Sequence, residues 1–173
     1  MTTSPISECN ENGLNIALLS KENLKSDFDY DPEGNLIWIG GRVSGRPKGK
    51  RAGWLNPHRG YKELRYKDQV HSLHRPIWIW HYGEIPQGLV VDHIDQDKGN
   101  NRIENLRLAT RKQNARNGKS RNDLPLGISR SPHGYRVQLT TDDGKRINRR
   151  FKSLAEATQC NRELRATHYG EFA

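Results

Sequence analysis

From Phe28 onwards, apolar and polar residues alternate in short runs separated by turn-forming residues, a pattern that predicts short β-strands. FDYDPEGNLIWIG predicts a hairpin that turns at Pro32-Glu33-Gly34, because proline sets the φ angle of a turn and glycine tolerates positive φ. GYKELRYKDQVHSLHR predicts a second hairpin around Lys67-Asp68-Gln69. Residues 1–24 are polar and predict a loose segment, with one or two helical turns in residues 15–24.

Two contrasting segments surround the second hairpin. Residues 40–53, GGRVSGRPKGKRAG, lack an apolar period, and we expect a mobile basic loop that is either a plain connector or a phosphate-contacting arm. HRPIWIWHYGEIP is expected to form a short helix after Pro76, a favoured first helical position, with Trp78, Trp80 and Tyr82 in a small core.

The next segment predicts a strand, a loop and a returning strand. LVVDHID is an apolar run that ends in polar residues, as expected of a strand that delivers side chains to a site. QDKGNNR is rich in turn-forming residues, and IENLRLAT predicts the returning strand. Thr110 is expected to cap a short helix, RKQNARNG, that Gly118 ends.

The C-terminal part predicts a small sheet with one helix. The pattern predicts three strands, in PLGISRS, YRVQLTT and KRINRRF. Turns are expected at His133-Gly134 and Asp142-Asp143-Gly144. A helix from Ser153 should carry a capping box with Glu156. Its helically spaced positions, which include a modest apolar stripe, are Leu154, Ala157, Asn161, Leu164 and His168.

The charge of the chain narrows the class of partner. The 173 residues include 29 Lys+Arg against 20 Asp+Glu, a formal charge of +9, which favours nucleic acid or an anionic membrane surface. No apolar run approaches the ~20 residues of a membrane-spanning helix, so we expect no membrane association. The N-terminus lacks the pattern of a signal peptide, which favours an intracellular, cytoplasmic protein. Cys9 and Cys160 form no CxxC pair, so we expect no structural zinc.

The residues after the apolar run point to phosphodiester hydrolysis. That reaction needs an activated water and a group that neutralises charge on the phosphate. Asp92 and the amide oxygen of Asn114 suit Mg²⁺, with Mn²⁺ as an alternative, because these ions prefer oxygen ligands. His93 can accept a proton from water near neutral pH. Asn105 could accept the Nδ1 proton of His93 and so orient Nε2 toward water.

Residues 71–117 resemble an HNH homing endonuclease. The residues that carry the resemblance are His74-Arg75, Asp92-His93-Ile94-Asp95, Asn100-Asn101-Arg102-Ile103-Glu104-Asn105-Leu106-Arg107, Thr110 and Asn114. The resemblance implies a ββα-metal fold in which Asp92 and Asn114 bind one divalent metal, His93 is the general base and Asn105 holds the hairpin loop. Asp95, Asn100 and Asn101 are expected to stabilise the loop rather than to bind metal.

Residues 124–173 resemble the DNA-binding domain of plant ethylene-responsive (Apetala-type) transcription factors, although the signature tryptophans of the plant members are missing. The carrying residues are Gly127-Ile128-Ser129, Tyr135-Arg136-Val137, Lys145-Arg146, Phe151, Ala155-Glu156-Ala157 and Tyr169-Gly170-Glu171-Phe172-Ala173. Strand alternation places Val137, Leu139, Ile147 and Phe151 toward the helix, with Arg149 at the rim of the sheet. The outer face, which we expect to contact DNA, then carries Arg136, Gln138, Arg146, Asn148 and Arg150.

Together these patterns predict an α+β protein, with N-terminal hairpins and a ββα-metal nuclease unit followed by a three-stranded antiparallel sheet on one helix. We divide it into a loose segment (1–24), an HNH nuclease domain (25–118), a linker (119–124) and an Apetala-type domain (125–173). Arg107 is expected to contact DNA, and Arg75 either to contact phosphate or to pair with an acidic residue.

The expected function is a sequence-directed endonuclease on double-stranded DNA, of homing type and of phage or mobile-element origin. The alternatives are a DNA-binding regulator that no longer cleaves, a structural RNA-binding protein, and a restriction or packaging nuclease of the same chemistry. The pattern leaves open the target sequence, one-strand or two-strand cleavage, the preferred metal, and whether the protein is a monomer or a dimer.

Overall fold

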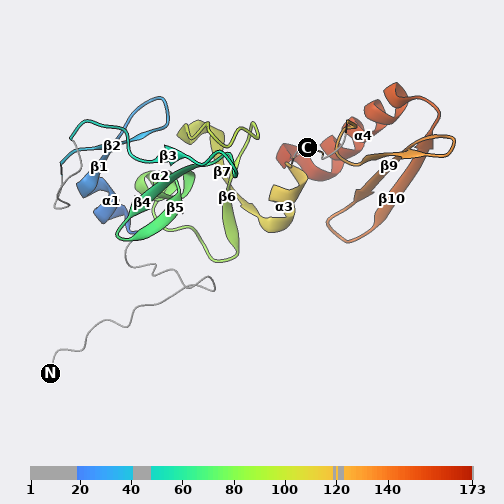
Figure 1. Ribbon diagram of the computed structural model, residues 1–173. Coiled ribbons are helices and arrows are strands. Elements are labelled where there is room, and N and C mark those ends of the chain that lie inside the picture. The colour runs from blue at the N-terminus through green and yellow to red at the C-terminus, as the bar shows by residue number, and fades with distance from the viewer. Residues whose placement is uncertain (1–18, 41–47, 119, 121–122, 173) are drawn as a thin grey trace. The chain divides into compact units, whose positions relative to one another are not determined.

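A computed structural model of the protein describes residues 19–40, 48–118, 120 and 123–172. The chain forms two compact units, residues 1–108 and 109–173. Both combine helices with antiparallel strands, so the predicted α+β class is confirmed (Figure 1). Residues 1–18, which include Cys9, lie outside the described residues, and so do residues 41–47, half of the basic loop predicted in residues 40–53.

The first unit begins with a short helix and the first predicted hairpin. Helix α1 (Lys21–Asp27) overlaps the helical turns predicted in residues 15–24 and extends beyond them. The Ser20 side chain caps it by accepting the backbone N–H of Asn23. Strands β1 (Phe28–Tyr30) and β2 (Leu36–Trp38) pair antiparallel, as predicted. The side chain of Asp31 closes the turn between them by accepting the backbone N–H groups of Glu33 and Asn35.

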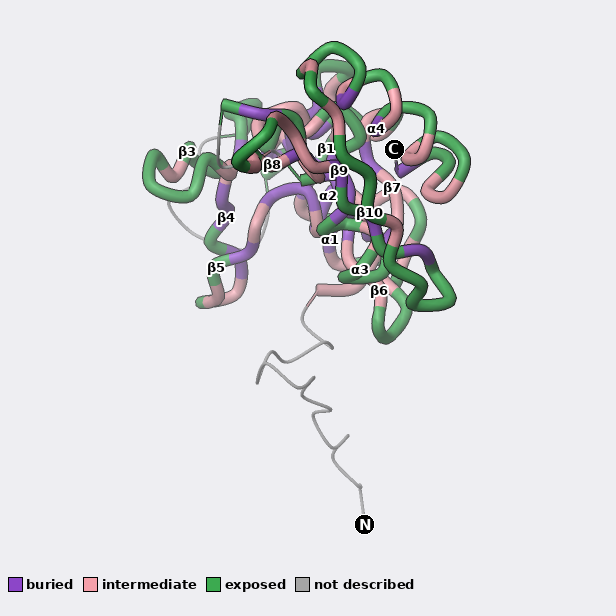
Figure 2. Tube along the Cα trace, turned by 90° about the vertical axis from the view of Figure 1, so that its right-hand side faces the viewer, coloured by how far each residue is buried: buried purple, intermediate pink, exposed green. Residues whose placement is uncertain are grey.

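The second predicted hairpin is also present, within a three-stranded sheet in the order β3-β4-β5. Strand β3 (Trp54–Leu55) is exposed at one edge, whereas β4 (Lys62–Tyr66) is largely buried (Figure 2). Strand β5 (Gln69–Ser72) follows after a two-residue turn. Lys67 and Asp68 both adopt positive φ, as the turn of a tight hairpin requires.

Helix α2 (His74–Tyr82) starts two residues earlier than predicted. Pro76 is its third residue, which is tolerated because the first N–H groups of a helix have no intrahelical partner. Trp78 and Trp80 pack against the core as expected, but Tyr82 does not, because its side chain is 62% exposed.

The segment that carries the candidate chemistry is a hairpin with a long loop. Strand β6 (Leu89–His93) and strand β7 (Leu106–Thr110) form a two-stranded sheet, and a short 3-10 helix, η2 (Ile103–Asn105), precedes β7. The apolar core of this unit joins the hairpins, α1, α2, β6 and β7. Its buried members are Leu24, Phe28, Leu36, Trp38, Ala52, Leu64, Tyr66, Leu73, Ile77, Ile79, Val91 and Leu106.

The second unit begins with helix α3 (Arg111–Arg116), which Thr110 caps as predicted. Thr110 and Gln113 form a full capping box, and the helix ends at Arg116 rather than at Gly118. Strands β8 (Ile128–Ser131), β9 (Gly134–Thr140) and β10 (Arg146–Phe151) form an antiparallel sheet in the order β10-β9-β8, as predicted.

Helix α4 (Leu154–Tyr169) lies along the sheet (Figure 1), and a short 3-10 helix, η3 (Gly170–Phe172), follows it. Ser153 caps α4, but its side chain accepts the N–H of Ala155 rather than that of Glu156 in a capping box. Ala157 and Asn161 are buried as the predicted stripe requires, whereas Leu154 is 36% exposed. The apolar core of this unit comprises Leu124, Ile128, Val137 and Ala157, with Tyr135, Phe151 and Leu164 against it.

Cys160 on α4 is a free thiol. Within the described part of the chain, no helix combines the length and the apolar character needed to cross a membrane.

Candidate nuclease site

Asp92 and His93 occupy the last two positions of β6 and are almost fully buried, 7% and 5% exposed. Their side chains have different partners. Oδ2 of Asp92 accepts a hydrogen bond from Nε of Arg107 at 3.1 Å. Nε2 of His93 lies 2.9 Å from Oδ1 of Asn101, in the loop that follows the strand. Neighbouring residues on a strand point to opposite faces, and these two sets of contacts agree with that alternation.

Asn105 ties the loop between β6 and β7 together. Its Oδ1 accepts the backbone N–H of Asp95, and its Nδ2 donates to Oδ1 of Asp95 and to the carbonyl of Asn100. Its backbone carbonyl accepts the N–H of Ile94. Burial alone would raise the pKa of the Asp95 carboxyl, but hydrogen bonds from Asn100, Asn105 and the Asp97 backbone lower it below its usual value. Asp95 therefore serves as an ionised acceptor that organises the loop.

Aromatic rings surround the imidazole of His93. The ring of His74, on the first turn of α2, meets it edge-on with 5.0 Å between centroids, and Tyr61 lies 6.1 Å away. Burial, together with the nearby charges of His93 and Arg75, lowers the pKa of His74 to about 3, so His74 is neutral near pH 7. The ammonium of Lys98 lies over the outer side of this group, 4.5 Å from the centroid of Tyr61. The imidazole of His93 therefore lies against the rings of His74 and Tyr61, and the Lys98 ammonium lies over the ring of Tyr61.

The remaining expected site residues lie in different settings. Arg75 is partly buried, and this burial lowers its pKa from the usual value. Arg107 contacts the carboxylate of Asp92, with only 11% of its side chain exposed. Asn114 is an exposed residue in the middle of α3, in the second unit. Helix α3 is fixed within that unit by Arg116, whose Nη2 lies 2.7 Å from Oδ1 of Asp142.

The polar face predicted for the C-terminal sheet is formed by the register of its strands. Residues directly opposite each other in an antiparallel pair point to the same face. Asn148 lies opposite Gln138, Arg150 opposite Arg136, and Arg146 opposite Thr140, so the five expected residues share one face.

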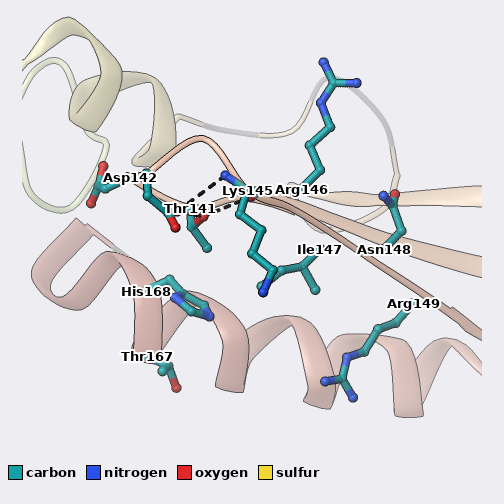
Figure 3. Close-up of a pocket in the computed structure, with 10 residues that line it drawn as sticks. Thr141, Asp142, Lys145, Arg146, Ile147, Asn148, Arg149, Thr167 and His168 are labelled. Carbon is teal, nitrogen blue, oxygen red and sulfur yellow. Dashed lines mark hydrogen bonds between the residues drawn. The ribbon is translucent and has the colours of Figure 1, made fainter.

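The other face of β10 lines a pocket against α4 (Figure 3). Arg149 lies opposite Val137 and therefore belongs to this helix-facing side, together with Lys145 and Ile147, while His168 reaches into the pocket from α4. Figure 3 shows the side chains of Arg146 and Asn148, which also line the pocket, directed away from α4. The sequence predicted that Arg149 lies at the rim of the sheet, but it did not predict which face of the sheet the side chain joins.

Sequence reasoning missed three contacts at His93. Asn101 was expected only to stabilise the loop. We expected Asn105 to accept the Nδ1 proton of His93 and to leave Nε2 toward water, but Nε2 lies 2.9 Å from Oδ1 of Asn101. The His74-Arg75 pair was noted, but nothing in its spacing indicated a ring contact with His93. Tyr61 lies outside the resembling segment, and no sequence signal identified it.

The oxygen donors fit a hard divalent cation by their chemistry. Among the described residues, no group of three or more His, Cys, Asp and Glu could hold a metal ion. Of the two expected metal ligands, only Asp92 is one of these four residue types, because Asn114 would bind through its amide oxygen. Mg²⁺ prefers oxygen ligands and needs only one or two from a protein, so the metal role of Asp92 and Asn114 stays a prediction.

Comparison with known proteins identifies the family. The model of the HNH endonuclease family matches residues 71–116. Protein 3.8 of Escherichia phage T7 is 32% identical over 115 residues, which cover 62% of this chain and 94% of that protein. The chain therefore belongs to the HNH endonuclease family, and its β6–β7 hairpin lies in the nuclease motif.

Further relatives carry the same family name. An HNH endonuclease of Acanthamoeba polyphaga mimivirus is 34% identical over 59% of this chain and 55% of its own length. A predicted HNH homing endonuclease of the SPbeta prophage of Bacillus subtilis is 34% identical over 42% of this chain and 44% of its own. The solved structure that describes DNA binding and cleavage by the HNH homing endonuclease I-HmuI matches 84% of this chain and 80% of that chain, at 23% identity and a TM-score of 0.44.

Proposed function

We propose that this protein is a sequence-directed DNA endonuclease of homing type, which hydrolyses phosphodiester bonds with one divalent metal and with His93 as general base. One observation carries the proposal. Within a matched HNH motif, Asp92 and His93 end the same buried strand, and each side chain is held by its own partner, Arg107 for the carboxylate and Asn101 for the imidazole. A carboxylate and an imidazole on adjacent residues, directed to opposite faces of the strand, supply the two functions that hydrolysis of a phosphodiester requires when metal and base approach the scissile phosphate from different sides.

In the proposed reaction His93 removes a proton from water, and the oxygen of that water attacks phosphorus. The P–O3′ bond breaks, and the departing oxygen takes up a proton, which gives a 5′-phosphate and a 3′-hydroxyl. The rings of His74, which is buried, and of Tyr61, which is partly buried, pack against the imidazole of His93 and hold it in place. Burial lowers the pKa of His74, so His74 is neutral near pH 7 and adds no positive charge beside His93.

Asp92 and Asn114 would hold the metal, Mg²⁺ or Mn²⁺, which when bound would neutralise charge on the phosphate and on the leaving oxygen. Asn105 supports the site by fixing the loop through Asp95 and Asn100. Arg107 orients the Asp92 carboxylate through the contact between its Nε and Oδ2 of Asp92. Arg75 and the Lys98 ammonium are proposed to contact the phosphate backbone, where cations add affinity without sequence preference.

Recognition of the target is proposed to rest on the C-terminal sheet, an Apetala-type DNA-binding domain. Its polar face brings three arginines together with a glutamine and an asparagine, the residue types that read guanine and adenine edges in the major groove. The relatives among phages, a prophage and a giant virus support a homing or mobile-element role.

The test is cleavage of supercoiled plasmids that carry a library of host DNA, by the full chain, with Mg²⁺ or with EDTA. We expect nicked or linear product with Mg²⁺ and none with EDTA, with ligatable 5′-phosphate ends. A parallel reaction contains structured RNA as competitor. Tight DNA binding without any cleavage would indicate a DNA-binding regulator instead of an endonuclease. Protection of the plasmid by RNA at equal concentration would indicate an RNA-binding protein.

A further inference from the structure

The imidazole of His93 is oriented by one buried amide. Nε2 of His93 lies 2.9 Å from Oδ1 of Asn101, whose side chain is 1% exposed. An amide oxygen only accepts hydrogen bonds, so Nε2 carries the hydrogen, and in the neutral ring the lone pair is on Nδ1. We propose that Asn101 is a positioning residue that fixes this tautomer and makes Nδ1 of His93 the atom that accepts the proton from water. The inference rests on the proposed role of His93 as general base.

Stability of the fold does not account for an amide at position 101. Nδ2 of Asn101 is buried and has no hydrogen-bond partner among the described residues. An unsatisfied buried donor lowers stability, whereas a leucine, which has the same branched shape, would avoid this cost. The contact between Oδ1 and His93 supplies the reason for an amide, because it is the hydrogen bond that only a polar side chain can make.

The first hairpin, which precedes the matched HNH segment, holds the Asn101 peptide in place. Gly34 adopts φ +83°, and a Cβ atom at this position would lie 2.5 Å from the carbonyl carbon of Asn101 and 2.5 Å from the backbone N of Arg102. The hydroxyl of Tyr30 accepts the backbone N–H of Ile103 at 2.9 Å. The turn and the last residue of β1 therefore contact the loop next to Asn101, and through it they set the position of the His93 ring.

Two substitutions at position 101 separate positioning from packing. Asn101→Leu removes the acceptor, and we expect kcat for plasmid cleavage to fall about 100-fold while KM for DNA changes less than about threefold, since general-base catalysis contributes on that scale. Asn101→Asp keeps an oxygen acceptor and should stay within about tenfold of the wild-type kcat. If Asn101→Leu cleaves with the wild-type kcat while His93→Ala is inactive, Asn101 does not position His93. Equal loss in both Asn101 variants would mean that the amide NH₂ faces the ring, which would overturn the tautomer.

The contact from the hairpin has a matched control. Gly34 and Gly88 both have φ +83°, so alanine is equally strained at either position, but no atom lies within 4 Å of a Cβ at Gly88. We expect Gly34→Ala to lower kcat at least tenfold more than Gly88→Ala does. If both variants are folded by circular dichroism and have equal kcat values, the first hairpin does not set the position of the His93 ring.

A spectroscopic readout is independent of cleavage. Two-bond ¹H–¹⁵N correlation spectra of the full chain, at a pH above the reference pKa of histidine of about 6.5 and without metal or DNA, report which nitrogen of His93 carries hydrogen. We expect Nε2–H in the wild type and a mixture of tautomers in Asn101→Leu. Nδ1–H in the wild type would overturn the inference even if the enzyme cleaves DNA. Nε2–H in a protein that cleaves nothing would leave the tautomer standing and refute the proposed function instead.

Discussion

Nε of Arg107 lies 3.1 Å from Oδ2 of Asp92, and the two side chains are only 11% and 7% exposed. The pair joins β7 to the end of β6 and puts a permanent cation beside the proposed metal ligand. A carboxylate removed from water is stable only with such a partner. The buried pair therefore holds the Asp92 carboxylate in place beside a compensating cation.

Removal of this arginine should destabilise the first unit. Arg107→Met leaves the Asp92 carboxylate buried without its cation, and we expect the free energy of unfolding to fall by about 3–5 kcal/mol, as for other broken buried pairs. Urea denaturation measures the change, with Arg102→Met as control because Arg102 is exposed nearby. If both variants lose less than about 1 kcal/mol, the carboxylate is not desolvated as the structure indicates.

The stability of the first unit should fall in acid through His74. The folded-state pKa of His74 is about 3, while an unfolded histidine titrates near 6.5, so below about 6.5 the unfolded chain binds a proton that the folded chain rejects. The free energy of unfolding should then drop by about 1.4 kcal/mol per pH unit, or about 2 kcal/mol between pH ~6.5 and ~5. Burial lowers the pKa of His71 as well, which adds a loss of the same sign.

Urea denaturation across this pH range measures the loss in the wild type and in His74→Phe. The variant keeps an aromatic ring against His93 but has nothing to protonate at position 74. Its stability should depend on pH less steeply, by about one proton. An unchanged slope would show that His74 is protonated in the folded protein.

The second unit is predicted to depend on Arg116 more than on its neighbour Lys112. Both side chains pair with Asp142, but that of Arg116 is 8% exposed and stacks 4.0 Å from the ring centroid of Tyr169, while that of Lys112 is 52% exposed. The contact between guanidinium and ring contributes about 0.5–2 kcal/mol. Arg116→Met should lower the Tm of the second unit clearly, and Lys112→Met should not. Equal shifts in calorimetry would contradict the stacking contact.

Adjacent arginines on β10 test the DNA-binding face. Arg150 lies opposite Arg136 on the polar face, whereas Arg149 lies opposite Val137 on the side of α4. Each substitution to alanine removes the same charge, so long-range electrostatics change equally. We expect Arg150→Ala to weaken binding to a cleaved DNA site by about 5-fold to 150-fold, the scale of one base contact, and Arg149→Ala to weaken it far less. A larger effect of Arg149→Ala in fluorescence anisotropy would move the interface to the other face of β10.

Local patterns were sufficient to predict most elements. Both hairpins, strand β6, the cap at Thr110 and the alternation that puts Arg136 and Asn148 on one face follow from neighbouring residues in the sequence. The start of α2 and the cap of α4 differ by one or two residues, because several N–H groups at a helix start compete for the same acceptor.

Contacts between distant segments could not be predicted in this way. Asn101 is eight residues from His93, and the loop closes onto the ring only because Asn105 bonds to Asp95 and Asn100. Tyr61 reaches His93 from the position before β4, and His74 reaches it from α2. Gly34 meets Asn101 across 67 residues of chain. Side-chain spacing carries no signal for such packing, which depends on how the elements come together.

The most direct test of the account compares wild type with His93→Gln on the same supercoiled DNA, with Mg²⁺, under single-turnover conditions. His93→Gln keeps a polar side chain in the buried site but cannot take a proton from water. We expect the cleavage rate of His93→Gln to be about 100-fold to 10,000-fold below that of the wild type, while the Kd for DNA and the Tm change little. A variant that cleaves at the wild-type rate would contradict the central claim that His93 is the general base.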